Sequence, residues 1–257
     1  MVPRTIVITG AGTGIGRACA ERFARQGNRV VLIGRRVEPL NQVAALTNGP
    51  GDAASADDWA QFVKQIHASG LGIDTLVTCA GGLGTGTVTN TDDKAWAAAM
   101  RVNLDSAFVS ARACMPDLIA RRGSIVFTAS ISSLAAGPEV CSYTTAKHAI
   151  IGLTRSLARD YGPQGVRVNA ICPGWVRTPM ADAEMQPLMA RYEETLDSAY
   201  KRACSNVPLR RPAEADEIAS VCAFLASSEA SIITGATIVA DGGSTIVDVP
   251  TLEFQDL

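Results

Sequence analysis

Two side chains that can exchange a proton lie close together in the chain: Tyr143 and Lys147 are four residues apart, and Ser130 precedes Tyr143 by thirteen residues. If the run is helical, this spacing places the phenol and the ammonium on one face, about one turn apart. A phenol ionises near pKa ~10 in water, and a cation within a few ångströms lowers that pKa by about 1–3. The pair could therefore donate and accept a proton near neutral pH. An ordinary amphipathic helix, with the tyrosine at its buried edge and the lysine in solvent, would show the same spacing.

Short apolar segments alternate with amphipathic ones along the chain. The predicted strands cover residues 5–9, 29–34, 74–79, 124–129, 166–172 and 236–240. The predicted helices cover residues 15–26, 37–46, 56–69, 92–121, 142–161 and 214–227. The strands are rich in Val, Ile and Thr and almost continuously apolar, which is typical of strands that are covered on both faces. This order predicts a single α/β domain over residues 1–257, with one doubly wound Rossmann-type parallel sheet and helices on both faces.

A glycine-rich run follows the first predicted strand and contains Gly10, Gly14 and Gly16. Glycines allow a tight turn and let the backbone approach an anionic pyrophosphate, while the helix that follows offers free N–H groups and the positive end of its dipole. Because the run ends a strand and begins a helix, we predict that it binds a dinucleotide; a glycine-rich turn without a ligand is the alternative. The spacing differs from G-x-G-x-x-G, because Ile15 occupies the last glycine position.

The end of the second predicted strand indicates which dinucleotide binds. In dinucleotide-binding folds an acidic residue at this point binds the ribose hydroxyls of NAD, but here Gly34 is followed by Arg35 and Arg36. A guanidinium can form two charge-assisted hydrogen bonds to a 2′-phosphate, which a carboxylate would repel. We therefore predict NADP(H) as the preferred cofactor, with NAD(H) as the alternative.

Composition argues against several other classes of protein. The 257 residues are 47% hydrophobic and 19% charged with a net charge of −2, which gives no electrostatic case for binding nucleic acid or an anionic membrane. No apolar stretch reaches the ~18 residues of a membrane span, and the N-terminus has no signal-peptide layout. The seven cysteines are scattered without a C-x-x-C pair, which predicts reduced thiols in a cytoplasm. His67 and His148 lack ligand spacing, so we expect no metal site.

Taken together, the glycine run, the Tyr-x-x-x-Lys motif and the C-terminal pattern resemble the short-chain dehydrogenase/reductase family, and within it 3-oxoacyl-reductase-like members, from Thr5 to about Ser244. The resemblance implies that the catalytic residues are Asn103, Ser130, Tyr143 and Lys147. It implies that the cofactor contacts Gly10, Thr13, Gly14, Ile15, Gly16, Arg35, Arg36, Asp52, Ala53, Ala80, Gly81, Tyr143, Lys147, Pro173, Gly174, Val176 and Thr178. Thr13 stands where some NADP enzymes of the family carry a second basic residue.

One segment departs from the family pattern. Where the family usually reads Asn-Asn-Ala-Gly, this chain reads Thr78-Cys79-Ala80-Gly81. The backbone approach to the cofactor at Ala80 and Gly81 can survive this change, whereas the side-chain hydrogen bonds of the missing asparagines cannot. The local rigidity of the loop and the details of ribose contact are therefore in doubt, but the class of chemistry is not.

The same resemblance implies an enzyme that transfers a hydride between nicotinamide and a ketone or secondary alcohol. Tyr143 would supply the proton to the developing alkoxide, its phenol made acidic by Lys147 and by oxidised nicotinamide, and Ser130 would donate a hydrogen bond to the same oxygen. Lys147 would also hold the nicotinamide ribose, and Asn103 would steady a water that passes protons to Lys147. Oxidation of a secondary alcohol or diol is one alternative. A non-catalytic dinucleotide sensor is another, although a sensor would not need Ser130, Tyr143 and Lys147 intact.

The substrate pocket is the least defined part of the prediction. Residues 180–206 form a long, polar, helical segment between a strand and the next helix, where ligands bind in open α/β sheets, and we predict a substrate lid there. A rigid surface helix pair is the alternative. The candidate pocket residues are Ser132, Val140, Trp175, Met185 and Met189. Trp175, Met185 and Met189 suggest an apolar or aromatic lining. We expect reduction of a ketone, such as a 3-oxoacyl or cyclic ketone. A carrier-protein substrate would need a basic docking surface, for which residues 162–165 offer no positive charge.

Two long helices are expected to form subunit contacts. The helices over 92–121 and 142–161 should lie on one side of the sheet and, as in the family, form the dimer faces of a homotetramer or homodimer. Their outward residues are expected to be small or apolar, including Ala107, Ala111, Leu153 and Leu157. The tail from Ser244 onward is longer than the fold requires; its apolar residues could pack across a subunit boundary, or the tail could fray.

Overall fold

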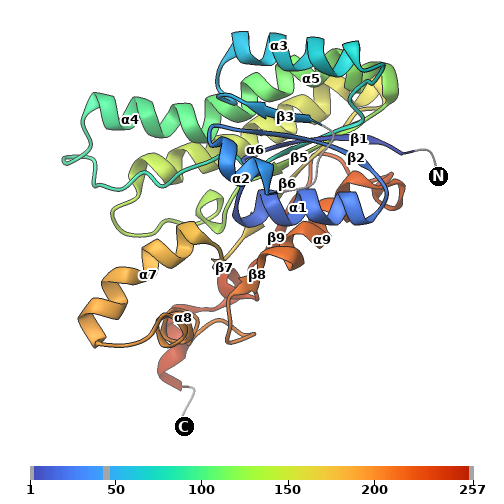
Figure 1. Cartoon of the computed structure of the whole chain (residues 1–257). Coiled ribbons are helices and arrows are strands. Elements are labelled where there is room, and N and C mark those ends of the chain that lie inside the picture. Colours follow the sequence, from blue (N-terminus) through green and yellow to red (C-terminus); the bar gives the residue numbers. More distant parts are fainter. Residues whose placement is uncertain (1–2, 43–46, 255–257) are drawn as a thin grey trace.

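A twisted sheet of seven parallel strands lies at the centre of the computed structural model, which describes residues 3–42 and 47–254 (Figure 1). The strand order is β3-β2-β1-β4-β5-β6-β9. The strand β1 pairs with both β2 and β4, so the chain winds outward in two directions from β1. This confirms the predicted doubly wound sheet, whose order reverses between β1 and β4. In open α/β sheets, ligands bind at such a reversal, beyond the carboxyl ends of the strands.

The strands of this sheet are Thr5–Thr9 (β1), Arg29–Gly34 (β2), Thr47–Pro50 (β3), Thr75–Thr78 (β4), Ser124–Thr128 (β5), Arg167–Pro173 (β6) and Thr237–Ala240 (β9). Two short strands pair apart from it, Val176–Arg177 (β7) and Ala213–Glu214 (β8). The α-helices are Gly14–Arg25 (α1), Val37–Asn41 (α2), Ala56–Ala68 (α3), Asp93–Met100 (α4), Ser106–Arg121 (α5), Cys141–Tyr161 (α6), Pro179–Tyr192 (α7), Leu196–Ala203 (α8) and Ala215–Ala226 (α9).

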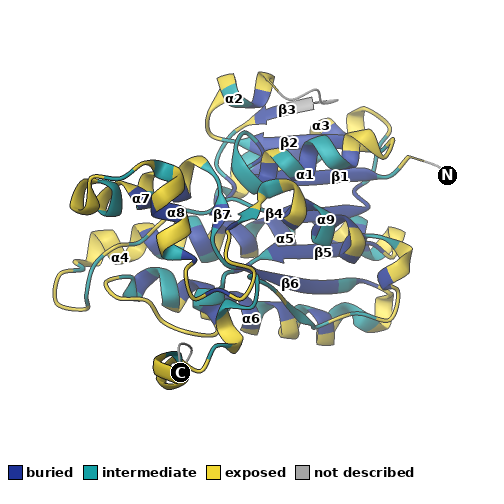
Figure 2. Ribbon diagram, turned by 90° about the horizontal axis from the view of Figure 1, so that it is seen from below, coloured by how far each residue is buried: buried dark blue, intermediate teal, exposed yellow. Residues whose placement is uncertain are grey.

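Two apolar layers join the sheet to its helices. Successive side chains of a strand point to opposite faces. In β1, Val7 accordingly packs in the layer under α3, α5 and α6, while Ile6 and Ile8 pack in the layer under α1 and α9. Each such side chain contributes about 1.5–3 kcal/mol when it is fully buried. Figure 2 shows the result, with the central strands in dark blue and the outer sides of the helices that cover the sheet in yellow.

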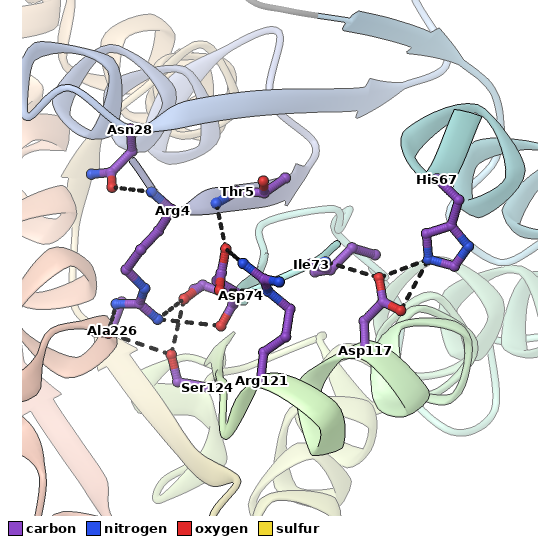
Figure 3. Close-up of polar contacts among 11 residues, drawn as sticks. Arg4, Thr5, Asn28, His67, Ile73, Asp74, Asp117, Arg121, Ser124 and Ala226 are labelled. Carbon is purple, nitrogen blue, oxygen red and sulfur yellow. Dashed lines mark hydrogen bonds and ion pairs between the residues drawn. The ribbon is translucent and has the colours of Figure 1, made fainter. Parts of the chain in front are cut away.

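A polar network fastens the amino ends of the strands, at the edge opposite the reversal (Figure 3). Asp74 accepts hydrogen bonds from the backbone N–H of Thr5 and from Nε of Arg121, both at 2.7 Å. Arg4 donates to the carbonyl of Ala226 at 2.6 Å and to Oγ1 of Thr75 at 2.7 Å. Hydrogen bonds to charged groups contribute about 1.5–3 kcal/mol each. The network therefore fixes β1, β4, α5 and α9 relative to one another. It lies at the amino ends of the strands, away from their carboxyl ends.

Three element predictions needed correction. The strand β3 was missed because Thr47–Pro50 contains no Val, Ile, Leu or aromatic residue, and pairing with β2 at the sheet edge forms it instead. The helix predicted over 37–46 ends at Asn41, and residues 43–46 lie outside the described residues. The helix predicted over 92–121 is interrupted by a π-helical turn, Arg101–Asp105.

The outward faces of α5 and α6 also differ from the prediction. Both helices lie on one side of the sheet, as expected. Ala107 and Ala111 point inward, however, and are buried in the core against the sheet. Leu153 and Leu157 are half-buried against the same core. The large apolar side chain that α5 exposes is instead Phe108.

The segment predicted as a lid forms the helices α7 and α8, which lie beyond the carboxyl ends of the strands (Figure 1). They share a small core of their own, in which Ala181 and Met185 of α7 pack against Ala199 and Tyr200 of α8. The hydroxyl of Tyr200 donates to Asp182 at 2.8 Å and closes this core on one side. Among the helices of the described residues, none combines the length and the apolar character that crossing a bilayer requires.

Candidate functional site

Helix α6 carries both residues of the pair that was predicted to exchange a proton. Tyr143 and Lys147 lie one turn apart near its amino end, and Nζ of Lys147 is 5.6 Å from the centre of the Tyr143 ring. Only 5% of Lys147 is exposed. Its Nζ donates to the carbonyl of Thr128, the last residue of β5, at 3.0 Å. Burial lowers the pKa of Lys147 to about 8, so the side chain is mostly charged at neutral pH and loses its charge in the mildly alkaline range.

Ser130 lies two residues after the end of β5 and close to Tyr143. Its Oγ accepts a hydrogen bond from the backbone N–H of Ser132 at 3.1 Å. Its hydroxyl also interacts with the phenol of Tyr143 and lowers the pKa of that phenol. Because the N–H of Ser132 occupies one acceptor site, the hydroxyl hydrogen of Ser130 is left to be donated on the Tyr143 side. Ser133 ties this loop to α6 by donating to the carbonyl of Lys147 at 2.7 Å.

The electrostatics of Tyr143 correct one expectation. Lys147 was expected to lower the pKa of the phenol. Burial instead raises the pKa of Tyr143 above its usual value, and the hydrogen bond to Ser130 offsets this only in part. The carboxylate of Glu184 raises it further. The cause is that phenol and ammonium are both withdrawn from water, which disfavours the charged form of each. At neutral pH, Tyr143 is therefore a neutral phenol that can donate its proton.

Asn103 lies in the π-helical turn, a feature that sequence periodicity does not reveal. Its Nδ2 donates to the carbonyls of Gly82 (2.8 Å) and Ala99 (3.0 Å), and its Oδ1 accepts from the N–H of Gly82 at 3.2 Å. A β-carbon added at Gly81 would lie 3.2 Å from Oδ1 of Asn103 and 3.8 Å from Nζ of Lys147. Asn103 of the π-helical turn and Lys147 of α6 therefore both lie close to Gly81. A π-helical turn contains one extra residue, and such turns are common at functional sites.

The glycine loop fits a dinucleotide pyrophosphate. Gly10 and Gly14 have φ values of +64° and +55°, which favour glycine, and a β-carbon at Gly10 would lie 2.6 Å from the carbonyl carbon of Cys79. Thr13 occupies the N-cap position of α1 but makes no side-chain capping bond. The first N–H groups of α1 therefore have no hydrogen bond from the N-cap side chain. Free N–H groups at the amino end of a helix are a common binding site for anions such as phosphate.

The segment after β6 closes one side of this loop. Thr178 lies against Gly14, since a β-carbon added there would be 3.0 Å from the Thr178 methyl group. Thr178 also caps α7 by accepting from the N–H of Ala181 at 3.2 Å. Gly174 approaches Asp241 so closely that its β-carbon would be 3.0 Å from that residue's Cα. Residues 173–178, which include Pro173 and Val176, thus connect the glycine loop to α7.

The residues predicted for the adenosine end gather beyond β2. Nη2 of Arg36 is 3.4 Å from Oγ1 of Thr13. Asp52 accepts from the N–H of Ala54 at 2.9 Å and from Nη2 of Arg101 at 2.7 Å. Burial raises the pKa of Asp52, but these two bonds and the charge of Arg35 outweigh it, so the pKa lies below its usual value. Arg101 was missed, because only the folded chain brings the π-helical turn beside Asp52.

Cys79 stands where the resemblance calls for asparagine, and the loop around it is held by other contacts. Its Sγ lies 3.4 Å from Oγ1 of Thr128, and the N–H of Ala80 donates to Oγ1 of Thr9 at 3.2 Å. Cys79 also packs on the apolar layer that contains Cys19. The strand ends on either side thus supply hydrogen bonds to this loop, and the approach of Ala80 and Gly81 to the cofactor stays a prediction.

The five predicted pocket residues lie in different surroundings. Ser132 follows Ser130 and is half-buried, and Val140 pairs with Gly86 across the loop that precedes α6. Trp175 and Met189 pack on the small α7–α8 core. Met185 is only 1% exposed and fills that core, the gap-filling role typical of methionine. This packing gives no support to Met185 as a pocket residue, and the other four stay predictions.

Comparison with known proteins agrees with this architecture. The family model described as enoyl-(acyl carrier protein) reductase matches residues 10–245. Protein MoaE of Klebsiella aerogenes is 52% identical over 260 residues, covering 98% of this chain and 99% of that protein. Meso-2,3-butanediol dehydrogenase of Serratia marcescens is 38% identical over 251 residues, covering 95% and 96%. The structure of a variant actinorhodin polyketide ketoreductase with NADPH superposes with a TM-score of 0.88 at 28% identity, covering 94% and 97%.

Proposed function

The chain belongs to the short-chain dehydrogenase/reductase family and is an oxidoreductase of CH–OH and C=O groups, and we propose that it acts as an NADP(H)-dependent ketoreductase. The observation that carries the proposal is the meeting of Ser130 and Lys147 at Tyr143, beside a glycine loop with uncapped helical N–H groups. Withdrawing a phenol and an amine from water lowers the stability of the fold. Titratable groups whose pKa values are shifted by such burial are typical of sites that transfer protons.

In the proposed reaction, four side chains each have a separate role. When bound, the nicotinamide supplies the hydride that reduces the carbonyl carbon. Tyr143 donates its proton to the carbonyl oxygen, and Ser130 donates a hydrogen bond to the same oxygen as negative charge develops there. The ammonium of Lys147 stabilises the phenolate left on Tyr143 and has hydrogens for the ribose hydroxyls. Asn103, fixed by Gly82, orients the path by which a proton returns to Lys147.

The buried lysine predicts how the reaction depends on pH. Its pKa of about 8 means that Lys147 is charged below that pH and neutral above it. The charge that stabilises the Tyr143 phenolate is therefore lost as the pH rises, and kcat/KM for ketone reduction should fall above about pH 8. The measurement is a pH profile of NADPH-dependent reduction. Lys147→Arg stays charged, because arginine does not deprotonate in proteins, and should remove the falling limb even though its rate is lower. An identical limb in Lys147→Arg would contradict the assignment.

The preference for NADP(H) is proposed from the arginines that follow β2. Arg35 and Arg36 place two cations near Thr13 and Asp52, where the adenosine ribose is expected. Charged hydrogen bonds contribute about 1.5–3 kcal/mol, so replacing both arginines by alanine should raise KM for NADPH about 10–100-fold and leave KM for NADH largely unchanged. Steady-state kinetics with both cofactors measures this, with Arg29→Ala at the other end of β2 as the control. Equal use of NADH and NADPH by the wild type, or an unchanged KM in the double variant, would refute the preference.

A second candidate is the reverse reaction on a secondary alcohol or diol, which the butanediol dehydrogenase relative favours. The same residues would serve, with Tyr143 accepting the proton. Parallel assays with ketones and NADPH, and with alcohols and NADP⁺ or NAD⁺, separate the two directions. Binding of NADPH without turnover of any carbonyl would instead favour the non-catalytic sensor.

We further propose a homodimer or homotetramer in the cytoplasm, with α7 and α8 as the substrate lid. Exposed apolar side chains support the oligomer: Phe108 on α5 is 45% exposed, and Val249 and Phe254 in the tail are 70% and 68% exposed. Scattered single residues of this kind occur on monomers, but aromatic ones are enriched at interfaces. The seven free cysteines support a reducing compartment.

A further inference from the structure

Arg101 is a cation beside the residues predicted for the adenosine end of the cofactor, and the proposed chemistry does not use it. It is the first residue of the π-helical turn, and its Nη2 donates to Oδ2 of Asp52 at 2.7 Å. This ion pair joins the loop after β3 to the turn that follows α4. The other oxygen of the carboxylate, Oδ1, accepts from the N–H of Ala54 at 2.9 Å. Both oxygens of Asp52 are therefore engaged.

The register of the sheet places Asp52 beside Arg35. Strands β2 and β3 run parallel with Gly34 opposite Pro50, and the N–H of Gly51 donates to the carbonyl of Gly34 at 3.1 Å. Arg35 and Asp52 are the residues that follow Gly34 and Gly51, so they leave the sheet at the same edge from neighbouring strands. Such strands lie about 4.7–4.9 Å apart, which is close enough for the two charges to act on each other.

The two arginines after β2 keep their charges available. In the part of the chain that the structure describes, neither Arg35 nor Arg36 forms an ion pair, and Arg36 reaches only as far as the neutral hydroxyl of Thr13, at 3.4 Å. Asp52 is the carboxylate that could pair with them, but it is bound by Arg101 instead. Both guanidinium groups are therefore free to bind an anionic ligand.

A carboxylate at Asp52 without its partner would oppose a 2′-phosphate. It would repel the phosphate and compete with it for Arg35. A second carboxylate, Asp58, accepts from the backbone N–H of Asp52 at 2.7 Å, so two negative charges would then lie side by side. Arg101 balances one of them at short range. A cofactor that lacks the 2′-phosphate would be much less sensitive to this balance, because it places no anion at this point.

We propose that Arg101 is a specificity-determining residue of the cofactor site: it neutralises Asp52 and thereby leaves the two guanidinium groups after β2 to the 2′-phosphate of NADP(H). This inference rests on the proposed preference for NADP(H) and assigns a part of it to a residue that does not itself bind the phosphate. The ion pair is partly exposed, with 52% and 38% of the two side chains accessible. Solvent and salt screen such a pair, so its effect is moderate and largest at low ionic strength.

A cycle of variants tests the proposal through one quantity, the ratio of kcat/KM with NADPH to kcat/KM with NADH, measured with a fixed ketone at low ionic strength. Arg101→Met should lower this ratio about 3–10-fold, mainly through KM for NADPH. Adding Asp52→Asn to Arg101→Met should return the ratio to within about twofold of the wild type, because the carboxylate that needed a partner is gone. Arg101→Lys keeps the charge and should keep the ratio. Asp52→Asn alone removes a negative charge and should leave the ratio unchanged or raise it.

Arg25→Met is the matched control. It breaks an ion pair of similar exposure, with Asp216 at 2.8 Å, and Arg25 is the last residue of α1, at the opposite end from the glycine loop. The ratio should stay at the wild-type value in this variant, which shows that the loss of any exposed ion pair is not enough to change it.

The failures of the two proposals are distinguishable. A wild type that prefers NADH would refute the proposed cofactor preference, yet a ratio that falls in Arg101→Met and returns in the double variant would still support the inference. An unchanged ratio in Arg101→Met, or a lower one in Asp52→Asn, would overturn it. A fall that the double variant does not reverse would also overturn it, because Arg101 would then bind the phosphate directly or act through the fold. If no ketone is reduced, fluorescence titration gives the ratio of dissociation constants for NADPH and NADH, to which the same outcomes apply, and absence of binding would overturn both proposals.

Discussion

Replacing Tyr143 by phenylalanine is expected to lower kcat for ketone reduction by about 10²–10⁴-fold, the usual contribution of a general acid. The change removes the phenol hydroxyl and keeps the aromatic ring of this α6 residue. Because the pKa of Tyr143 is raised, the group is fully protonated at neutral pH. Steady-state kinetics with saturating NADPH measures the loss, which should appear in kcat while KM for NADPH changes little.

The matched control lies on the same helix. Tyr161→Phe changes the last residue of α6, which packs on the edge of the core far from the site, and should leave kcat near that of the wild type. Circular dichroism and melting temperatures of both variants exclude misfolding as the cause of a loss. If Tyr143→Phe keeps more than about a tenth of the wild-type rate, the proton comes from another group and the assignment is wrong.

Ser130→Ala should cost about 10²–10³-fold in kcat, the range measured for removing one donor to a developing oxyanion. The effect follows from the orientation of this hydroxyl, whose oxygen accepts from the N–H of Ser132 and whose hydrogen is thereby left for the substrate oxygen. The variant should also raise the pKa of Tyr143 further, since it removes the one hydrogen bond that lowers it. The measurement is kcat with a fixed ketone and saturating NADPH.

Ser220→Ala provides the comparison for this loss. Ser220 is a serine of α9 whose hydroxyl donates to the carbonyl of Asp216 within the helix, so its replacement should leave kcat unchanged. A loss of less than about threefold in Ser130→Ala would mean that the developing oxyanion is stabilised by Tyr143 alone, against the range expected for such a donor.

The fold could be predicted where the pattern of apolar residues is strong. Five of the six predicted strands are buried along almost their whole length, and this burial imposes an apolar run that can be read from the sequence. The sixth, β9, is only half-buried, and its β-branched residues make it recognisable. Thr47–Pro50 shows the limit of this signal. It is an edge strand whose formation depends on pairing with β2, and three of its four residues, Asn48, Gly49 and Pro50, are of types that are rare in strands.

The site could be predicted where spacing along the chain fixes spacing in space. Tyr143 and Lys147 share one turn of α6, and the glycine loop directly precedes α1, so local structure alone brings each set together. Contacts that depend on tertiary packing could not be read in this way. The bond of Arg101 to Asp52 and the burial of Met185 are examples. The direction of the Tyr143 pKa was also missed, because burial, which no spacing reveals, outweighs the nearby cation.

The most direct test of the central claim is to follow hydride transfer itself. Wild-type enzyme and Tyr143→Phe are incubated with ketone and NADPH deuterated at the transferring position of the nicotinamide, and the alcohol product is analysed by mass spectrometry. The account predicts one deuterium on the carbinol carbon with the wild type, and product formation at least about a hundredfold slower with Tyr143→Phe. Alcohol that lacks deuterium, or equal rates for the two proteins, would contradict it.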